Sequence, residues 1–412
     1  MQALYVTDFI LVVLFCICYA FQFVYLIVPF VKKIPAAKGG TDHKFAVIIP
    51  ARDEENVISG ILAALKEQSY PSHLIYPVVI ADNCTDGTAE VAGSLGARVY
   101  ERSSKDKVGK GYALEYALLM LDRDFGEGFF DAYIVFDADN IPKDNFITEI
   151  NKVFSSGYDV ITCYRNSKNF ADSWLSAGAA VWFLRESKYL NGSRARIGAC
   201  PQVSGTGFLF SRRIKDEIGG WPYHTLTEDY EFTCDSVIKG RRFGYCESAE
   251  FYDEQTATFR ESWYQRLRWC KGGLQSFELF KKDLFKGLFS KKFFACYDLI
   301  MSLAPAYILS IAACLINLVA VAAVVIGGGD WKAAVLAPLT LVVCAYTLAF
   351  VQGFFTVLTE WKRINASAFH KILYSFTFPI YLMTFIPIAF VAIFCKNVSW
   401  KKISHGKSEK RK

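Results

Sequence analysis

The 412-residue sequence has few charged residues, and this scarcity excludes several classes of protein. Only 21% of the residues are charged, whereas 53% are hydrophobic and 16% are aromatic. A disordered chain would show the opposite balance, because disorder goes with high charge and few apolar side chains. The composition also argues against an ordinary soluble protein.

Closely spaced cysteine pairs are almost absent. The sequence has 12 cysteines but no CxxC pair, and the nearest two, Cys16 and Cys18, lie inside an apolar run. This spacing excludes a small disulfide-stapled fold. We therefore expect buried free thiols in a reducing compartment.

The main part of the chain also lacks an excess of basic residues. The net charge is +6, and all of it belongs to residues 396–412, which hold seven basic residues and one acidic residue. The other 395 residues are balanced, so no basic face remains to neutralise the phosphates of a nucleic acid. We expect the basic tail to bind anionic lipid headgroups if it is cytoplasmic.

Long charge-free segments account for the hydrophobic residues. Four of them are long enough to cross a bilayer as helices, at 9–31, 299–329, 333–359 and 372–395. The first is too long for a signal-peptide core and has neither a basic n-region nor an A-x-A-like cleavage site. Since the four segments carry no charge and form no inverted repeats, a transporter is not expected.

The sequence therefore predicts a membrane-anchored globular domain. Its expected segments are an N-terminal anchor at 1–33, a globular domain at 34–258, interfacial helices at 259–298, a membrane region of about three spans at 299–395 and a basic tail at 396–412. Lys and Arg residues flank the spans on the side of the globular domain, which favours a cytoplasmic domain. Whether the tail is also cytoplasmic stays open, because Pro379 and Pro387 would permit a re-entrant last segment.

Strand and helix patterns alternate in the globular domain. Apolar runs of strand length occupy 45–51, 74–81, 98–101 and 132–136, and helical patterns occupy 57–67, 109–121 and a segment from about Thr88. This alternation predicts an α/β fold with a mostly parallel sheet. In such sheets, ligands bind beyond the carboxyl ends of the strands.

Acidic residues follow three of these strands. They are Asp53-Glu54-Glu55, Asp82 before Asn83, and Asp137-Ala138-Asp139. Any one of them could simply cap a helix or form a turn. Gathered at one sheet edge, however, they would repel one another unless a cation compensates, and carboxylate oxygens suit Mg²⁺ or Mn²⁺. Together they predict a site for a metal ion and a nucleotide diphosphate.

Three further motifs follow in the second half of the domain. Residues 202–208 are glycine-rich, which lets a backbone approach a ligand closely. Thr227-Glu228-Asp229 precedes a predicted helix at 230–239 and could be only its N-terminal cap. The segment 265–269 (QRLRW) lies in an apolar helical stripe and could be only an interfacial anchor, as could a helix at 277–294. Its Gln265 and Arg268 nevertheless share a helix face.

The order of these motifs resembles the D, DxD, TED, QxxRW series of membrane-embedded family 2 glycosyltransferases. This group includes cellulose, chitin, hyaluronan and poly-N-acetylglucosamine synthases and lipid glucosyltransferases. The matching segments are Pro50-Ala51-Arg52-Asp53-Glu54, Asp82, Gly109-Lys110-Gly111, Asp137-Ala138-Asp139, Thr227-Glu228-Asp229 and Gln265-Arg266-Leu267-Arg268-Trp269. The sequence departs from the usual pattern at Asp53, where Asn is common, and at Asn83, where a second Asp is frequent.

The resemblance implies a GT-A (Rossmann-like) fold and inverting transfer from a UDP-sugar. It implies donor and nucleotide contacts at Glu54, Asp82, Lys110, Asp137, Gln265 and Arg268. It implies that Asp229 is the general base and that Asp139 ligates Mg²⁺ or Mn²⁺. It also implies that Trp269 and Glu228 lie on the acceptor side. Trp269 would bind the acceptor, and Glu228 would orient Asp229 or cap its helix.

The acceptor stays open, because QxxRW occurs both in polymerases and in enzymes that glycosylate one lipid headgroup. We expect extension of a cell-surface polysaccharide, and a membrane lipid acceptor is the alternative. A non-catalytic membrane module is the hypothesis from another class, and it predicts dispensable carboxylates. By the resemblance, the enzyme would lie in the plasma membrane with its catalytic domain in the cytosol, as a homo-oligomer or with an accessory subunit.

Overall fold

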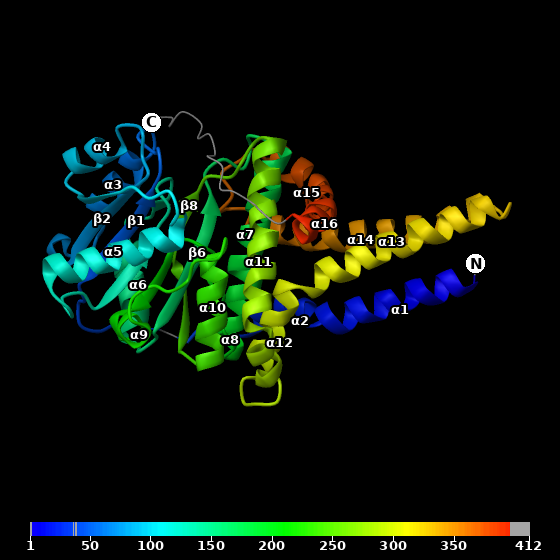
Figure 1. Ribbon diagram of the computed structural model, residues 1–412, viewed down its shortest axis with the longest axis horizontal. Coiled ribbons are helices and arrows are strands. Elements are labelled where there is room, and N and C mark those ends of the chain that lie inside the picture. Colours follow the sequence, from blue (N-terminus) through cyan, green and yellow to red (C-terminus); the bar gives the residue numbers. More distant parts are fainter. Residues whose placement is uncertain (1, 36, 38, 396–412) are drawn as a thin grey trace. The chain divides into compact units, whose positions relative to one another are not determined.

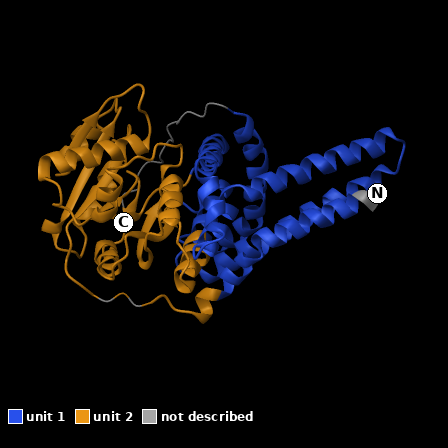
Figure 2. Cartoon of the chain, turned by 60° about the horizontal axis from the view of Figure 1, so that its bottom comes forward, with its two compact units in different colours: residues 1–27, 169–185, 256–399 blue, residues 28–168, 186–255, 400–412 orange. Residues whose placement is uncertain are grey.

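The computed structural model describes residues 2–35, 37 and 39–395, so the predicted basic tail at 396–412 lies outside the described residues. The described chain forms two compact units (Figure 2). The helical unit comprises residues 2–27, 169–185 and 256–395, and the sheet unit comprises most of residues 28–168 and 186–255. Each unit contains segments that are distant in the sequence.

The sheet unit is built on one eight-stranded sheet with the strand order β3-β2-β1-β4-β7-β6-β8-β5. Figure 1 labels β1, β2, β6 and β8 of this sheet. The strands are β1 (Phe45–Ala51), β2 (Ile75–Asp82), β3 (Arg98–Arg102), β4 (Ala132–Val135), β5 (Ile141–Pro142), β6 (Val160–Ser167), β7 (Phe208–Ser211) and β8 (Phe243–Asp253). Strands β3, β2, β1 and β4 run parallel, as do β6 and β8, whereas β7 is antiparallel to both of its neighbours. This arrangement confirms the predicted α/β class.

Helices of the sheet unit connect the strands. They are α3 (Ile58–Lys66), η1 (Ser72–Leu74), α4 (Thr88–Ser94), α5 (Lys110–Phe125), α6 (Phe146–Ser155), η2 (Glu186–Asn191), α8 (Gly192–Ile197), α9 (Arg212–Ile218) and α10 (Glu228–Lys239). The helices predicted at 57–67, 109–121 and 230–239 are confirmed. Helix α5 continues four residues further than expected, and α10 begins two residues earlier.

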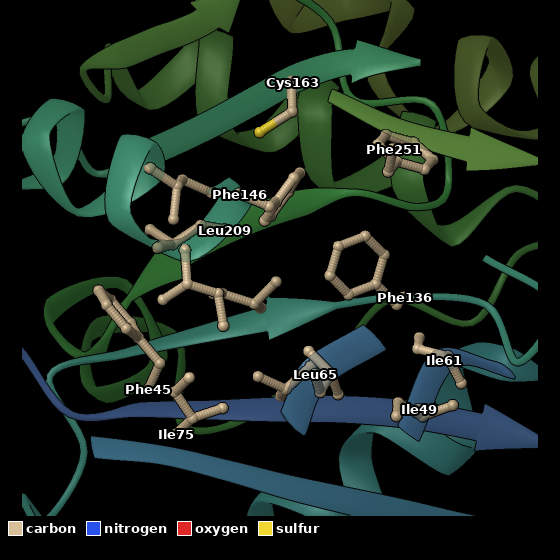
Figure 3. Close-up of a cluster of buried hydrophobic side chains, with 14 of the residues drawn as sticks. Phe45, Ile49, Ile61, Leu65, Ile75, Phe136, Phe146, Cys163, Leu209 and Phe251 are labelled. Atoms are coloured by element: carbon tan, nitrogen blue, oxygen red, sulfur yellow. The ribbon is translucent and has the colours of Figure 1, made fainter. Parts of the chain in front are cut away.

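The core of the sheet unit explains why these elements form. Every residue of β1 except Pro50 is buried, as is usual for a parallel strand covered on both faces. On one face, Phe45 and Ile49 share a cluster with Ile61 of α3 and Phe146 of α6 (Figure 3). Helix α5 packs on β1, β2 and β3. Because the sheet is rigid, the residues at its strand ends are held in fixed places.

Four stretches of the described chain are long and apolar enough to cross a membrane. They are Leu4–Val31, Pro305–Ile326, Ala334–Thr359 and Ala368–Phe394, close to the four charge-free segments. The helices that begin in the helical unit are α1 (Gln2–Tyr19), α2 (Phe21–Val31), α7 (Trp174–Arg185), α11 (Phe259–Gly287), α12 (Phe293–Leu303), α13 (Pro305–Ile326), α14 (Trp331–Thr359), α15 (Ala368–Met383) and α16 (Phe385–Phe394). The last stretch breaks near Thr384, between Pro379 and Pro387, so it is two helices.

The first apolar stretch extends beyond the charge-free segment at 9–31 and includes Asp8, which is buried and accepts a hydrogen bond of 2.7 Å from Nδ2 of Asn317. One expectation about the helices near the membrane segments is wrong. The predicted helix at 277–294 is interrupted, because α11 ends at Gly287. Helix α12 folds back there so closely that a Cβ on Gly287 would lie 2.3 Å from Sγ of Cys296.

The expectation of buried thiols holds only in part. Five cysteines are buried, namely Cys163, Cys234, Cys246, Cys270 and Cys296. Cys16, Cys314 and Cys344 are exposed on the surfaces of apolar helices that are long enough to cross a membrane. An apolar environment suits a thiol there as well.

Candidate active site

The three strands that precede the acidic residues end at one edge of the sheet. Ala51, the last residue of β1, pairs with Ala81 of β2, and Ile48 of β1 pairs with Val135 of β4. Asp82 is itself the last residue of β2. Since the strands are parallel, the loops that follow them emerge at the same edge, as the sequence predicts.

The loops after β1 and β2 are hydrogen-bonded to each other. Oδ1 of Asp53 accepts hydrogen bonds from the backbone N of Thr85 (2.7 Å) and from its hydroxyl (3.1 Å). The backbone N of Gly87 donates to Oε2 of Glu55 at 2.8 Å. Asp53 and Glu55 therefore act as turn-forming residues, which was the simpler alternative for each of them.

The two departures from the usual family pattern both lie in left-handed backbone. Asp53 has a φ of 57° and Asn83 a φ of 55°, and they are the described non-glycine residues with positive φ. Asn and Asp are the side-chain-bearing residues that best tolerate this conformation. Oδ1 of Asn83 also accepts a hydrogen bond of 2.8 Å from the backbone N of Ser104. The left-handed backbone thus suits an Asp or an Asn at each of the two positions.

Asp53, Cys84 and Asp86 form a cluster whose ligand atoms lie within 4.8 Å of one another. Two of their oxygens accept hydrogen bonds: Oδ1 of Asp53 accepts from the backbone N of Thr85, and Oδ1 of Asp86 accepts a hydrogen bond of 2.5 Å from the hydroxyl of Thr88. The cluster joins two loops, and it does not include Asp139, the predicted metal ligand.

Asp82 forms an ion pair with Arg102 of β3. Nη1 of Arg102 lies 2.5 Å from Oδ1 of Asp82, and less than a tenth of either side chain is exposed. The same oxygen accepts a hydrogen bond of 3.1 Å from Nδ2 of Asn83. Glu54 lies in the adjacent loop, where its backbone N donates to the hydroxyl of Thr88 at 2.8 Å. The carboxylate of Asp82 is thus held firmly at the strand end.

Lys110, the first residue of α5, connects two of the predicted motifs. Its Nζ donates to Oδ1 of Asp137 at 2.5 Å and to the carbonyl oxygen of Gly205 at 2.8 Å. Burial alone would lower the pKa of Lys110, but the charges of Asp137, Glu228 and Asp229 outweigh burial and raise it. Lys110 and these three carboxylates therefore form one charged group, which we call the Lys110 cluster.

The DxD motif follows β4 directly. About two fifths of the Asp137 side chain is exposed, whereas Asp139 is nearly buried. The backbone N of Asp137 donates to the hydroxyl of Thr206 at 2.9 Å. Mg²⁺ is commonly held by one or two carboxylates together with substrate phosphates, and the two aspartates offer this donor set. The residues present therefore fit a divalent ion.

Glu228 and Asp229 occupy the first turn of α10, and both are buried. A helix N-terminus stabilises negative charge. Oδ2 of Asp229 lies 3.6 Å from the position that a Cβ on Gly205 would take, and Gly205 has a φ of +82°. The glycine-rich loop predicted at 202–208 thus lies directly beside the TED motif and, through its carbonyl oxygen, beside Lys110.

Glu186, in the π-helical turn η2, was not predicted. Burial raises the pKa of its carboxyl, Arg165 and Arg194 oppose this rise, and the charge of Asp229 adds to it. Isolated π-turns often mark functional positions. The sequence offered little signal, because Glu186 directly follows the apolar segment that forms α7.

The QxxRW residues belong to α11, in the helical unit. The hydroxyl of Thr256 donates to Oε1 of Gln265 at 3.4 Å, and the ring of Trp269 packs edge-on against Phe183 with centroids 5.8 Å apart. Arg266 is completely buried, whereas Arg268 is partly exposed. The structure thus places Gln265, Arg268 and Trp269 on one helix, and the predicted carboxylates in the sheet unit.

Several charged and polar residues that contact the predicted site residues could not be identified from the sequence. They are Arg102 of β3, Asn140 after the DxD motif, Arg165 of β6 and Asp253 of β8. Asp253 ends a strand, so the strand-end argument would have found it if the strand at 243–253 had been predicted. The others require tertiary contacts between segments that lie far apart in the sequence.

Comparisons with known proteins now identify the family. A family model described as "Glycosyltransferase like family 2" matches residues 43–272, which is more than half of the chain. The chain is 26% identical over 236 residues to a beta-monoglucosyldiacylglycerol synthase of Synechocystis sp., covering 56% of this chain and 48% of that one. It is 29% identical over 101 residues to a poly-beta-1,6-N-acetyl-D-glucosamine synthase of Staphylococcus aureus, covering 24% of each.

A solved structure shares the fold along nearly the whole chain. The mannosyltransferase PcManGT of Pyrobaculum calidifontis, solved with GDP-Man and Mn²⁺, superposes with a TM-score of 0.59 at 18% identity, covering 95% of this chain and 99% of that one. The chain spans about half the length of the curated relatives it matches. From the extent of the family match and the shared fold, the chain belongs to the glycosyltransferase-like family 2.

Proposed function

We propose that this family 2 enzyme is an inverting, metal-dependent glycosyltransferase that moves a hexose or N-acetylhexosamine from a UDP-sugar to an acceptor at the membrane. The Lys110 cluster carries this proposal. It brings the DxD residue Asp137 and the TED residues Glu228 and Asp229 around one partly buried ammonium group. Transfer needs both a positive charge beside the departing diphosphate and a base beside the acceptor.

Asp229 is the proposed general base. Its carboxylate takes the proton of the acceptor hydroxyl while the acceptor oxygen forms a bond to the anomeric carbon. The bond from that carbon to the diphosphate oxygen breaks, and UDP departs with the electron pair. Glu228, adjacent on the first turn of α10, orients Asp229 or caps the helix. Lys110 stays protonated beside both and offsets their negative charge.

Asp139, together with Asp137, would hold Mg²⁺ or Mn²⁺, and the ion would neutralise charge on the leaving diphosphate. The mannosyltransferase that shares this fold was solved with Mn²⁺, which supports a divalent ion as the cofactor. Asp137 also contacts the nucleotide in this proposal. Its exposure, with about two fifths of the side chain accessible, leaves room for that contact.

The ion pair of Asp82 favours uracil over guanine as the donor base. Arg102 and Asn83 both bind Oδ1 of Asp82, and no described residue donates to Oδ2. At this position a donor base would meet one hydrogen-bond acceptor, Oδ2 of Asp82, with the guanidinium donors of Arg102 beside it. Uracil presents one N–H between two carbonyl oxygens and complements this pattern, whereas guanine presents two adjacent donors. Glu54, in the neighbouring loop, is the further proposed uridine contact.

The acceptor we favour is a membrane lipid that receives a single sugar. The curated relatives that match 56–65% of this chain include three beta-monoglucosyldiacylglycerol synthases. The poly-N-acetylglucosamine synthase matches only 24% of the chain, and it supports extension of a cell-surface polysaccharide as the second candidate. Both acceptors are consistent with four stretches that are able to cross a membrane.

The resemblance assigns Gln265 and Arg268 to the diphosphate and Trp269 to the acceptor. The lysines and arginines that flank the apolar helices favour a cytosolic catalytic domain. The plasma membrane is the location that the family resemblance implies. A homo-oligomer or an accessory subunit would extend the membrane path that a polymer requires.

Release of nucleoside diphosphate tests the proposal. The full-length protein in detergent, with Mn²⁺ and a mixed lipid extract, should release UDP from at least one UDP-sugar and should stop when a chelator is added. Parallel GDP-sugar reactions test the assignment of the base. Turnover that persists in chelator would contradict the metal role of Asp139, and turnover with GDP-sugars alone would contradict the argument from Asp82.

A further inference from the structure

Asn140 directly follows the DxD motif and is completely buried. Its amide is fully hydrogen-bonded. Nδ2 donates to Oδ1 of Asp139 at 3.1 Å and to Oδ1 of Asp253 at 2.9 Å. Oδ1 accepts from the hydroxyl of Thr206 and from the backbone N of Asp137 at 3.3 Å. An amide has two N–H donors and two lone pairs, so none of its capacity is left over.

The far side of this network is also fixed. Nε of Arg165 donates to Oδ2 of Asp253 at 2.9 Å, and Nε2 of Gln255 donates to the same oxygen at 2.8 Å. Nη1 of Arg165 donates to the carbonyl oxygen of Ser204 at 3.0 Å. Asn140 therefore connects the DxD motif to an anchored carboxylate at the end of β8, and Thr206 connects it to the glycine-rich loop.

The chemistry of the position explains why it is an amide. The side chain must donate toward two carboxylates and accept from one hydroxyl and one backbone N–H. A carboxylate of the same shape would set three negative groups side by side without a donor between them, and an apolar residue would leave buried polar atoms unpaired. Among side chains of this size, an amide alone satisfies all four partners.

We propose that Asn140 is a positioning residue for the divalent ion, because it fixes the carboxylate of Asp139 and the backbone at Asp137. This inference rests on the proposed function. Groups that orient the ligands of a metal ion commonly change its affinity about 10- to 100-fold when they are replaced. The effect of Asn140 is therefore expected in metal affinity and much less in binding of the nucleotide alone.

The test is a titration of the full-length protein with Mn²⁺ in the presence of UDP and without an acceptor. The EPR signal of free Mn²⁺ measures how much of the ion is bound. Asn140→Asp should weaken Mn²⁺ binding about 10- to 100-fold, while UDP binding without metal stays within about twofold. In turnover, the KM for Mn²⁺ should rise, and kcat at saturating Mn²⁺ should change less. Since a third buried carboxylate can unfold the sheet unit, Asn140→Ala is the second variant, with the same expected direction.

Asn151→Asp is the matched control. Asn151 is equally an asparagine buried in the sheet unit, but it lies on α6 and contacts His43 and the carbonyl oxygen of Thr41 instead of the DxD motif. Its variant should keep the Mn²⁺ affinity of the wild type. If a folded Asn140 variant binds Mn²⁺ as tightly as the wild type, the inference is wrong and the proposed function stands. If the wild type binds no Mn²⁺ with UDP, both the metal assignment and the inference are wrong.

Discussion

The ammonium group of Lys110 lies 2.5 Å from the carboxylate of Asp137 and 2.8 Å from the carbonyl oxygen of Gly205. This relationship joins the start of α5, the end of β4 and the glycine-rich loop. Since Asp229 lies beside the same glycine, one partly buried cation adjoins both Asp137, the proposed nucleotide contact, and the proposed base. The central electrostatic feature of the site is therefore this lysine.

Replacement of Lys110 by Gln should lower kcat/KM for the donor about 100-fold, because the preorganised positive charge beside Asp137 and Asp229 is lost. Steady-state kinetics with the preferred UDP-sugar measure the effect. Lys152→Gln is the control, since Lys152 pairs with Glu149 on the partly exposed surface of α6. Equal activity of the Lys110 variant and this control would contradict the role assigned to Lys110.

Replacement of Asp229 by Asn should lower kcat by about 10²- to 10⁴-fold, because the amide cannot accept the acceptor proton. The affinity for UDP, measured by calorimetry, should stay close to that of the wild type. Asp216→Asn, at an exposed acid on α9, should leave both quantities unchanged. Loss of UDP binding in the Asp229 variant would show that this residue serves the donor instead.

Glu247 of β8 should make the sheet unit sensitive to acid. Burial raises the pKa of its carboxyl, but Lys188 and Arg196 outweigh burial, so its pKa lies below the ordinary value. The pKa of a Glu carboxyl in the unfolded chain is about 4.3. Because the pKa of Glu247 is lower in the folded state, its carboxylate stabilises the fold above pH 4.3, and this stabilisation is lost as the pH falls through the folded-state pKa. We expect Glu247→Gln to lower Tm by about 2–4 °C at pH 7 and by less at pH 3.

Thermal unfolding followed by intrinsic fluorescence measures this difference at both pH values. Glu278→Gln is the control, because about seven tenths of the Glu278 side chain is exposed. A constant difference between the wild type and the Glu247 variant at both pH values would contradict the assignment.

Arg266, within the QxxRW segment, should matter for the stability of the helical unit. It is completely buried, donates to the carbonyl oxygen of Tyr381 and the hydroxyl of Thr384, and lies 4.6 Å and 5.0 Å from the ring centroids of Tyr381 and Phe385. These partners surround the break between α15 and α16. Arg266→Ala should cost at least about 2 kcal/mol, because buried acceptors lose their donor.

Detergent-solubilised protein should therefore unfold at a lower temperature in Arg266→Ala than in Arg260→Ala, a substitution at an exposed residue of the same helix. Arg266→Lys should recover part of the loss. Equal unfolding temperatures for the two alanine variants would show that Arg266 does not hold the break.

Much of the sheet unit could be predicted from the sequence, because short apolar runs separated by helical patterns determine parallel strands. That argument also brought Asp82 and Asp137 to one edge. It could not predict that Asp53 and Glu55 are used in joining two loops, since the hydrogen-bonding partners of a turn depend on the neighbouring loop. Asn140 is similarly beyond a sequence argument, because its partner Asp253 is 113 residues away in the chain.

The most direct test of the account is the mass of the product that forms from an isotopically labelled UDP-sugar. Full-length protein in vesicles that contain diacylglycerol, with Mn²⁺ present, should yield a lipid one labelled sugar heavier, and Asp229→Asn should yield none. A ladder of products that differ by one sugar would select the polysaccharide candidate instead. If no acceptor carries label from any UDP-sugar while GDP-sugars are consumed, the central claim of transfer from a UDP-sugar is wrong.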